Sequence, residues 1–418
     1  MENVAHTLAG LVLGEAVIAL RRDRSPAFVR SALFTSALAG NLPDADILYA
    51  GTMDRPLGYL LHHRGHTHTI AGGLALGILL AITAIAVLRR RGLAGGDLRW
   101  IGFLAVLGPI VHLGMDAANV YGTHPFWPID GRWVFGDAVF IVEPLLWAVA
   151  LPPLVALARG RAWRVTLGGL LLAGLVLPWV VAGFVPLVCR VALVAVAALS
   201  SLGAWLAGRR GRVTIALVGF CLVFLGFAAV GREARAVISS RLAETWPDES
   251  RHDLALTPLP ANPFCWSAVS VTIDGGDLVL RRATIATWSS LLDASRCPSF
   301  ATETTAPLRP VDDEGDAAIR WEGVWRAPLS ELVELAQEDC EIAAFLRFAR
   351  APFWLRRREG IVIGDLRFDR EQPLGFAELH SQPGHGCPAW VPPWTPPLAE
   401  VMTGKHERGR ASPSRRGL

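Results

Sequence analysis

The sequence predicts a polytopic α-helical membrane protein with an extramembrane α+β domain at its C-terminal end. Three observations lead to this fold class. Apolar residues make up 52% of the chain and charged residues only 18%, which is too apolar for an ordinary soluble domain. Long apolar runs follow one another up to about residue 230. From Gly231 onward such runs stop, and shorter alternating patterns replace them.

Eight apolar runs approach the roughly 17 to 25 residues that a helix needs to cross a bilayer. They are residues 4–20, 31–48, 70–88, 101–119, 139–158, 165–183, 187–207 and 213–230. The second run contains Pro43, Asp44 and Asp46, so we expect a short or broken helix there. The first run has no basic residue ahead of it and contains His6, which is untypical of a signal peptide, so we expect a retained helix.

Arginines predict the orientation of these helices. The connections 21–30, 89–100, 159–164 and 208–212 carry fourteen arginines, whereas the alternate connections carry only Arg55, Arg64, Arg132 and Arg190. By the positive-inside rule the first set is cytoplasmic. We therefore expect an integral inner-membrane protein whose N-terminus and C-terminal domain are extracytoplasmic.

With this topology, the candidate ligands among residues 1–150 fall at the outer face of the membrane. They are His6, Asp44, Asp46, His62, His63, His66, His68, His112, Asp116, His124 and Glu143. Ionisable groups within spans are costly unless they are paired or coordinated. His112 and Asp116 are four residues apart and share one face of a helix. The pattern predicts a metal site at this face.

Mixed imidazole and carboxylate ligands suit zinc, with manganese or iron as alternatives. Each of these motifs, taken alone, also has a purely structural explanation. His6 could be a packed residue, and "PDAD" could be a turn with hydrogen bonds from its aspartates. Of His62, His63 and His66, one or two could contact only lipid headgroups. A carboxylate in a span needs a partner, so Asp116 is the strongest part of the pattern.

The order "H…NLPDAD…HHRGHTHT…HLGMDAANVYGTHPFWP…VEP" resembles the YdjM-type family of predicted membrane-bound metal-dependent hydrolases over about residues 1 to 150. The resemblance implies a metal site made of His6, Asp44, Asp46, His63, His68, His112 and Asp116, with Glu143 as the acidic residue before proline. His66 falls at a position that the family leaves free.

The same order resembles, more distantly, the zinc-dependent phospholipase C and nuclease superfamily, which implies His124 as a further ligand. The sequence departs from that pattern at Val139, where the superfamily has histidine, so we expect one or two ions rather than three. The resemblance implies phosphoester chemistry, and a membrane location favours a lipid-like ester as substrate.

These parts suggest a mechanism. Asp46, His68, His112 and Asp116 would hold the metal, together with His6, His63, His124 and Glu143 in the wider site. Asp44 would act as general base or orient a histidine, and Arg64 would pair with a phosphate. A headgroup contact or a salt bridge is an equal alternative for Arg64. We expect a metal-dependent hydrolase; a non-catalytic cation-binding or transport protein with the same ligands is the alternative.

The remaining chain divides into three predicted segments. Residues 151–230 are apolar with small residues and are expected to be scaffold helices, in which Cys189 and Cys221 pack. Residues 231–402 should form the α+β domain, with a hairpin at Asp274–Asp277, a helix from Ser330 to Pro352 and a strand in "EGIVIGDLRFD". Residues 403–418 are basic and predicted to be disordered.

Four cysteines fall in the predicted outer domain, namely Cys265, Cys297, Cys340 and Cys387. On the outer side of the membrane they could form two disulfides, with three possible connectivities. The sequence contains no nucleic-acid-binding module and no phosphate-cradling glycine loop. The expected partners are membrane lipid and the substrate, not nucleic acid.

Overall fold

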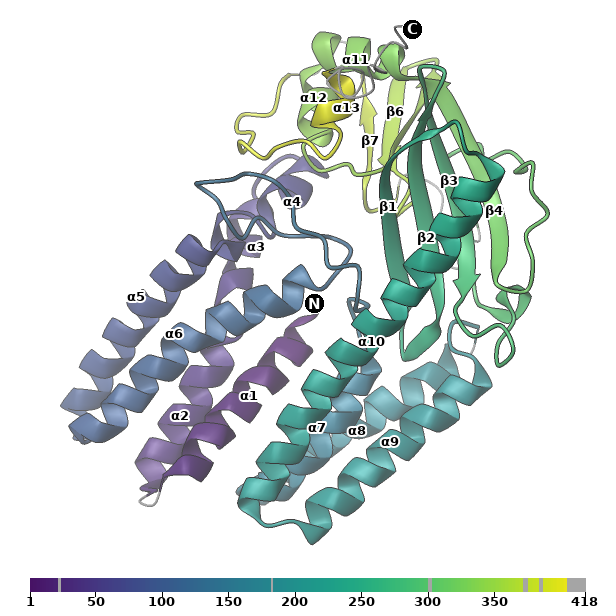
Figure 1. The fold of residues 1–418 in the computed structure, drawn as a ribbon. Helices are drawn as coiled ribbons and strands as arrows, with labels where there is room; N and C mark the ends of the chain where they lie inside the picture. Colours follow the sequence, from purple (N-terminus) through teal and green to yellow (C-terminus); the bar gives the residue numbers. More distant parts are fainter. Residues whose placement is uncertain (22–23, 182, 300–302, 371–374, 383–385, 404–418) are drawn as a thin grey trace, which may run out of the picture.

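The computed structural model describes residues 1–21, 24–181, 183–299, 303–370, 375–382 and 386–403. Helices fill the chain up to Thr245, and strands follow from Ser250 (Figure 1). This arrangement confirms the predicted class, a polytopic helical protein with a C-terminal α+β part. Except for Thr403, the predicted tail of residues 403–418 lies outside the described residues.

Eight main helices form the first part. They are α1 (Asn3–Leu20), α2 (Pro26–Ala39), α5 (Ile70–Arg90), α6 (Gly95–Ala117), α7 (Pro144–Leu157), α8 (Arg161–Val180), α9 (Leu187–Leu206) and α10 (Arg209–Thr245). Between α2 and α5 lie the short helices α3 (Ile47–Ala50) and α4 (Leu57–His62) and two 3-10 turns, η1 (Leu42–Asp46) and η2 (His66–His68).

Six of the described helices, rather than the expected eight, are long and apolar enough to cross a membrane: α1, α5, α6, α8, α9 and α10. Helices α2 and α7 have 14 residues each, which gives a length of about 21 Å against a hydrocarbon layer of about 30 Å. The second apolar run is cut because α2 ends at Ala39 and the η1 turn, which contains Pro43, follows from Leu42. The fifth run is cut because Glu143 caps α7 and Pro144 begins it.

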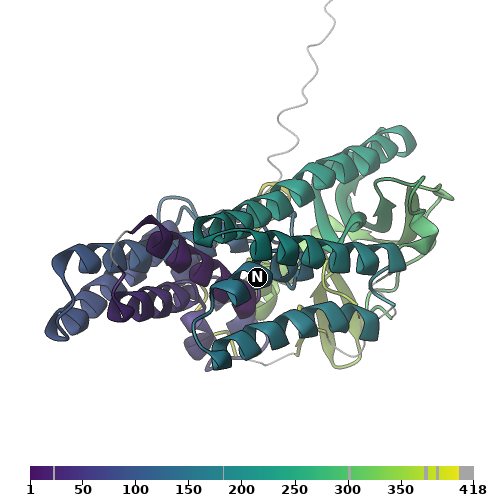
Figure 2. The ribbon, with the colours of Figure 1, turned by 90° about the horizontal axis from the view of Figure 1, so that it is seen from below.

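The helices form two groups, which Figure 2 shows from below. In one, α1 packs on α2 and α6 packs on both α2 and α5; in the other, α7 contacts α8, α9 and α10. The ends of α1 and α5 and the start of α10, where the arginine-rich connections lie, point away from the strands (Figure 1). There the buried Glu15 pairs with Arg209, and Arg21 pairs with Asp97 at 2.6 Å.

Helix α10 joins the two parts. It has 37 residues and continues past the predicted apolar run to Thr245, so that its last turns pack on β1, β2 and β3. Gly231 allows this close approach, because a Cβ atom there would lie 2.9 Å from the buried ring of Trp266.

The part of the chain after α10, which we call the outer part after its expected side of the membrane, contains two antiparallel sheets. One has the order β1 (Ser250–Leu259), β2 (Asn262–Asp274), β3 (Asp277–Ala286), β4 (Ile319–Pro328), and the other β5 (Pro352–Arg357), β6 (Gly360–Asp365), β7 (Glu378–Ser381). Asp274 pairs with Asp277 in the expected hairpin, where Gly275 and Gly276 adopt positive φ.

Helices α11 (Leu329–Glu338), α12 (Cys340–Phe345) and α13 (Ala399–Met402) complete the outer part. The single helix expected from Ser330 is divided in two at Asp339. The carboxylate of Asp339 accepts hydrogen bonds from the amides of Glu341 and Ile342, so it begins a new helix rather than continuing the first.

Buried polar contacts hold the outer part against the helical part. Arg350 donates to Asp137 at 2.8 Å and to Asp253 at 2.5 Å. The indole of Trp394 donates to the carbonyl oxygen of Leu61 at 2.8 Å. An unpaired buried charge is costly, so the ion pair of Asp137 and Arg350 holds the helical part and the outer part in this relative position.

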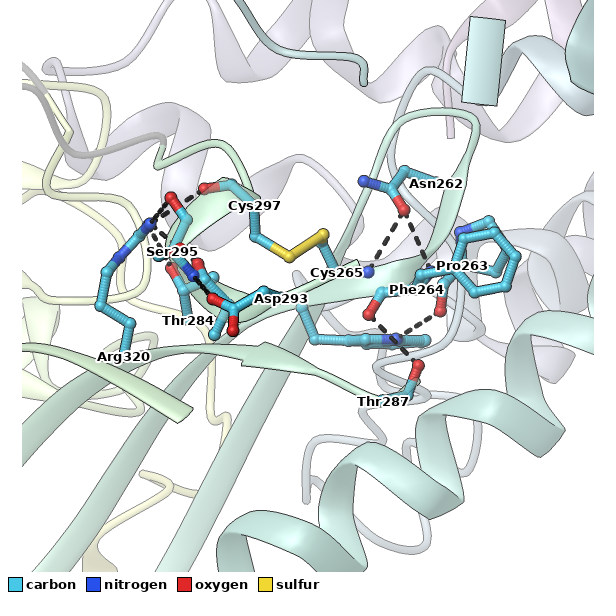
Figure 3. Close-up of a disulfide and its surroundings, with 12 residues drawn as sticks. Asn262, Pro263, Phe264, Cys265, Thr284, Thr287, Asp293, Ser295, Cys297 and Arg320 are labelled. Atoms are coloured by element: carbon cyan, nitrogen blue, oxygen red, sulfur yellow. Dashed lines mark hydrogen bonds between the residues drawn. A yellow bond between two sulfur atoms is a disulfide. The ribbon is translucent and has the colours of Figure 1, made fainter. Parts of the chain in front are cut away.

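Two disulfides, Cys265–Cys297 and Cys340–Cys387, resolve the connectivity that the sequence leaves open. Figure 3 shows the first of them, between β2 and the turn after β3. Arg320 holds this turn by donating to the carbonyl oxygens of Ala294 and Cys297 (Figure 3). Cys189 and Cys221 are free.

A thiol count checks this pairing. We expect denatured, unreduced protein to bind two equivalents of an alkylating reagent, on Cys189 and Cys221, and reduced protein to bind six. The reason is that disulfides form and persist in oxidising compartments. Intact-mass spectrometry gives both numbers, and finding six reactive thiols before reduction would show that the outer part is reduced.

Candidate metal centre

The candidate centre lies where the outer ends of α1 and α6 meet the connection between α2 and α5. Helix α1 contributes His6, and the last two turns of α6 contribute His112 and Asp116. Pro43 starts the η1 turn that presents Asp44 and Asp46, and the η2 turn presents His68. The structure therefore brings together residues from four separated segments.

Four ligand atoms form the centre of this cluster. They belong to Asp44, His68, His112 and Asp116, and all lie within 4.8 Å of one another. The Nε2 atom of His68 is 3.3 Å from Asp44 Oδ1 and 3.3 Å from Asp116 Oδ2. The corresponding distances for His112 Nε2 are 3.5 and 3.6 Å. These edges match the spacing of about 3.4 Å between the corners of a tetrahedron with metal–ligand distances of about 2.1 Å.

The tautomers of both histidines are set by their outward-facing nitrogens. His112 Nδ1 lies 2.7 Å from the carbonyl oxygen of Gly40, so this nitrogen carries the proton. His68 Nδ1 lies 3.1 Å from Asp46 Oδ2, with the same consequence. With these tautomers the two Nε2 atoms face each other as lone pairs at 3.0 Å, and the contact is a hydrogen bond only where one of them is protonated. Two facing lone pairs and two carboxylate oxygens are a donor set for a cation.

Asp46 supports the cluster from behind. It is fully buried and accepts from His63 Nδ1 at 2.9 Å, Thr67 Oγ1 at 2.8 Å and the amide of Arg64 at 3.0 Å, besides its contact with His68. Asp46 and His63 also form a second possible ligand group with Asp44. Asp44 is therefore common to both groups, while Asp46 mainly orients histidines.

Hydrogen bonds keep both aspartates of the η1 turn ionised. Burial alone would raise the pKa of Asp44, but hydrogen bonds from Nε2 of His112 and His68, which form when these nitrogens carry a proton instead of binding a cation, outweigh burial and hold the pKa below its ordinary value. Burial likewise opposes the hydrogen bonds of Asp46 with His63 and His68, which lower its pKa. Both carboxylates are thus in the state that binds a metal.

His6 lies on the other side of Asp116. Its ring stacks on that of His112 at 3.7 Å, and its Nε2 is 3.3 Å from Asp116 Oδ1 without hydrogen-bond geometry. The α-amino group of Met1 contacts the same carboxylate oxygen. His6 therefore lies beside the four-residue cluster and contacts it at Asp116.

Arg64 lies over the cluster with φ +59°, a conformation that residues other than glycine seldom adopt. Its Nε is 3.0 Å from Asp116 Oδ2, and its guanidinium lies 5.0 Å from the ring centre of Tyr121. Among the described residues its Nη1 has no hydrogen-bond partner.

Two predicted ligands lie elsewhere. His124 is buried between Trp133 and Trp394, with its Nδ1 3.2 Å from the carbonyl oxygen of Gly131, and neither ligand group includes it. Glu143 accepts from the amides of Leu145 at 2.9 Å and Ala261 at 3.2 Å, so its carboxylate caps α7 and holds the β1–β2 turn.

Sequence reasoning missed two supporting groups. Thr67 donates to Asp46, and its position between the histidines of "HTHT" could have suggested a supporting role. The carbonyl oxygen of Gly40 carries no sequence signal, because any residue has one. Its availability follows from the end of α2 at Ala39, since the last carbonyls of a helix lack intrahelical partners.

A family model described as YdjM inner membrane protein matches residues 1–187, which confirms the resemblance seen in the motifs. The matched region contains the whole cluster, and the strands of the outer part lie beyond it. No curated protein and no solved structure matches significantly. The more distant resemblance to zinc-dependent phospholipase C remains a prediction.

Metal content tests the cluster with a matched pair of variants. We expect His68→Ala to lower the affinity for the metal at least about 100-fold, because the substitution removes a direct ligand. Loss of a group that only hydrogen-bonds to a ligand typically lowers metal affinity about 10- to 100-fold. His66→Ala should leave the metal in place, because His66 stacks on Trp390 instead. Elemental analysis of the purified proteins decides the question, and equal metal in both variants would refute the assignment.

Glu143 gives a pH-dependent prediction. Burial raises the pKa of Glu143 to about 8. A raised folded-state pKa contributes stability at low pH that is lost as the pH rises through that value. Glu143→Gln keeps an acceptor oxygen without the charge, so we expect it to melt several degrees above the wild type at pH 9 and to lose that advantage at pH 5. Its metal content should be unchanged, whereas loss of metal would make Glu143 a ligand.

Proposed function

We propose that this chain, whose residues 1–187 match the YdjM inner membrane protein family, is a membrane-bound metal-dependent hydrolase. The single observation behind the proposal is the pair of facing imidazole nitrogens of His68 and His112 between the carboxylates of Asp44 and Asp116. With both Nδ1 atoms protonated, these nitrogens present lone pairs to each other, and a divalent cation would complete the arrangement. Zinc fits the donor set best, with manganese or iron as alternatives.

Asp44, His68, His112 and Asp116 would hold the ion. Asp46 would keep His68 in the tautomer that presents Nε2, through the 3.1 Å contact with Nδ1. A bound divalent ion supplies Lewis acidity to a phosphoryl or carbonyl oxygen and activates water. The protein's own part is to fix the ligands, exclude bulk water and supply Arg64, whose Nη1 could donate to a developing anion.

His63 is placed to move a proton. Its Nδ1 lies 2.9 Å from Asp46 Oδ1, which orients the ring, and its side chain lines a cavity beside the cluster. A histidine oriented by a buried carboxylate is a common arrangement for general acid–base catalysis. We assign to His63 the uptake of the proton that the attacking water loses and its transfer to the leaving group, and Asp44 remains the alternative for the uptake.

The substrate would be a phosphoester or a lipid-like ester at the outer face of the membrane. Two facts support this location. The arginine-rich connections lie at the opposite ends of the helices from the cluster, and the outer part contains two disulfides. Positive charge marks the cytoplasmic side, and disulfides persist in oxidising compartments.

Turnover is the direct test. Purified protein, supplied with zinc or manganese, should hydrolyse members of a panel of phospholipids and soluble phosphodiesters, and a chelator should stop the reaction. His68→Ala should lower the rate at least about 100-fold, as expected for loss of a metal ligand, and His66→Ala should retain it. Phosphate release or product mass spectrometry measures the rate. Stoichiometric metal without turnover of any ester would instead favour a non-catalytic cation-binding protein.

A further inference from the structure

A groove of about 670 Å³ lies between α2 and α5, and we call it the α2–α5 groove. Its lining residues run along α2 from Ala27 to Leu38 and along α5 from Leu80 to Arg91. At about 1.5 Å per residue, each wall is about 16 Å long. This is about half of a hydrocarbon layer of about 30 Å, so the groove is as long as one lipid leaflet is thick. None of the four residues of the metal cluster lines it, so the groove is a separate site.

The walls of the α2–α5 groove are largely apolar and remain exposed. Both helices pack on α6, and between them Phe34 is 71% exposed, Val87 42% and Leu38 40%. Helix α5 is one of the helices long and apolar enough to cross a membrane, so the medium beside these side chains is lipid. Membrane helices that pack on each other usually meet through small residues, whereas these side chains are large. The surface therefore suits an acyl chain better than a further helix.

One end of the α2–α5 groove is cationic. Arg30 lies in the second turn of α2 and Arg91 is the C-cap residue of α5, and both line the groove. Both residues are exposed, and neither forms an ion pair with a described residue. The lining residues at the opposite end, around Leu38 and Leu80, carry no ionisable side chain. The groove thus has a charged end and an apolar end, as a phospholipid has.

The excess of positive charge at this end does not depend on any single pairing. The two connections beside it, residues 21–30 and 89–100, contain eight arginines against the two acidic residues Asp23 and Asp97. Asp97 pairs with Arg21 at 2.6 Å. Asp23 lies outside the described residues, but even complete pairing of both aspartates leaves six arginines of these connections without an acidic partner from them. Arginine clusters at the ends of membrane helices attract anionic lipid headgroups.

We propose that the α2–α5 groove binds one anionic phospholipid, with its phosphate between Arg30 and Arg91 and an acyl chain along Phe34, Leu38 and Val87. Guanidinium groups bind phosphate oxygens through charge-assisted hydrogen bonds, and basic pockets between membrane helices recognise lipid headgroups in this way. The lipid ties α2, which is too short to cross the membrane alone, to α5. The site uses none of the residues of the proposed hydrolase and stands independently of it.

Native mass spectrometry of the full chain in neutral detergent tests the site. The protein is titrated with phosphatidylglycerol or with phosphatidylcholine of identical acyl chains, so that only the headgroup differs. The wild type should bind one phosphatidylglycerol with a Kd at least about tenfold below that for phosphatidylcholine, as expected for charge-assisted hydrogen bonds. The double variant Arg30→Gln, Arg91→Gln should lose this preference. Both residues are exposed, so the variant should keep the melting temperature of the wild type.

Two matched controls separate charge from shape. The double variant Arg161→Gln, Arg164→Gln removes two exposed arginines from another connection and should keep the preference for phosphatidylglycerol. Thr83→Phe fills the α2–α5 groove and should abolish one-to-one binding of phosphatidylglycerol. Ala86→Phe, an exposed position of the same helix that does not line the groove, should leave binding unchanged.

Four results would overturn the proposal. Equal affinity of the wild type for the two lipids would mean that the groove holds only the surrounding bilayer lipid. Equal losses in the two double variants would mean attraction by the overall charge of this side. A preference retained in Thr83→Phe would place the headgroup outside the groove. A dimer that Thr83→Phe dissociates would mean that a second copy of the chain fills the groove.

Discussion

The need to balance buried charge at the outer ends of α1 and α6 is the constraint on which the rest of the structure depends. Asp44 and Asp116 bring negative charge to a site where His68 and His112 offer only lone pairs. Removing ions from water costs several kcal/mol each, so such a group persists only with a counter-charge. Arg64 supplies part of that charge through Asp116. The α-amino group of Met1 contacts the same carboxylate. The cluster could also hold a cation, and metal binding would then contribute to the stability of the fold.

The short helix α2 makes this cluster possible. Because α2 ends at Ala39, the carbonyl oxygen of Gly40 is free to accept from His112. The approach is close: a Cβ atom at Gly108 would lie 2.4 Å from the side chain of Ala39. A helix that crossed the whole membrane at this place would move Gly40 and the η1 turn away from α6. The same short sequence, "GNLPDAD", therefore ends α2 before it could cross a membrane and forms the turn that carries Asp44 and Asp46.

The sequence was sufficient where a local pattern decides the structure, and insufficient where distant segments meet. The four-residue spacing of His112 and Asp116 correctly placed both on one helix face, and the alternation around Gly275 and Gly276 predicted the hairpin. The motif "PDAD" could not show which aspartate faces the ligand nitrogen of His68 and which faces its outward nitrogen. This depends on where the histidines lie around the turn. Glu143 follows the family order, but its partner is the amide of Ala261, more than a hundred residues away.

The depth of the cluster favours catalysis over transport. Asp116 is one residue from the end of α6, and His6 is three residues from the start of α1, so at about 1.5 Å per residue the ligands lie within a few ångströms of the outer helix ends. A cation path would need further polar groups below them. Along α1, which is described throughout, residues 8–14 are apolar or glycine, and Glu15 beyond them pairs with Arg209. On α6, also fully described, residues 100–111 contain no ionisable side chain. Along these two helices, therefore, no polar path leads from the cluster toward the opposite helix ends, which is what a cation transporter with this site would need.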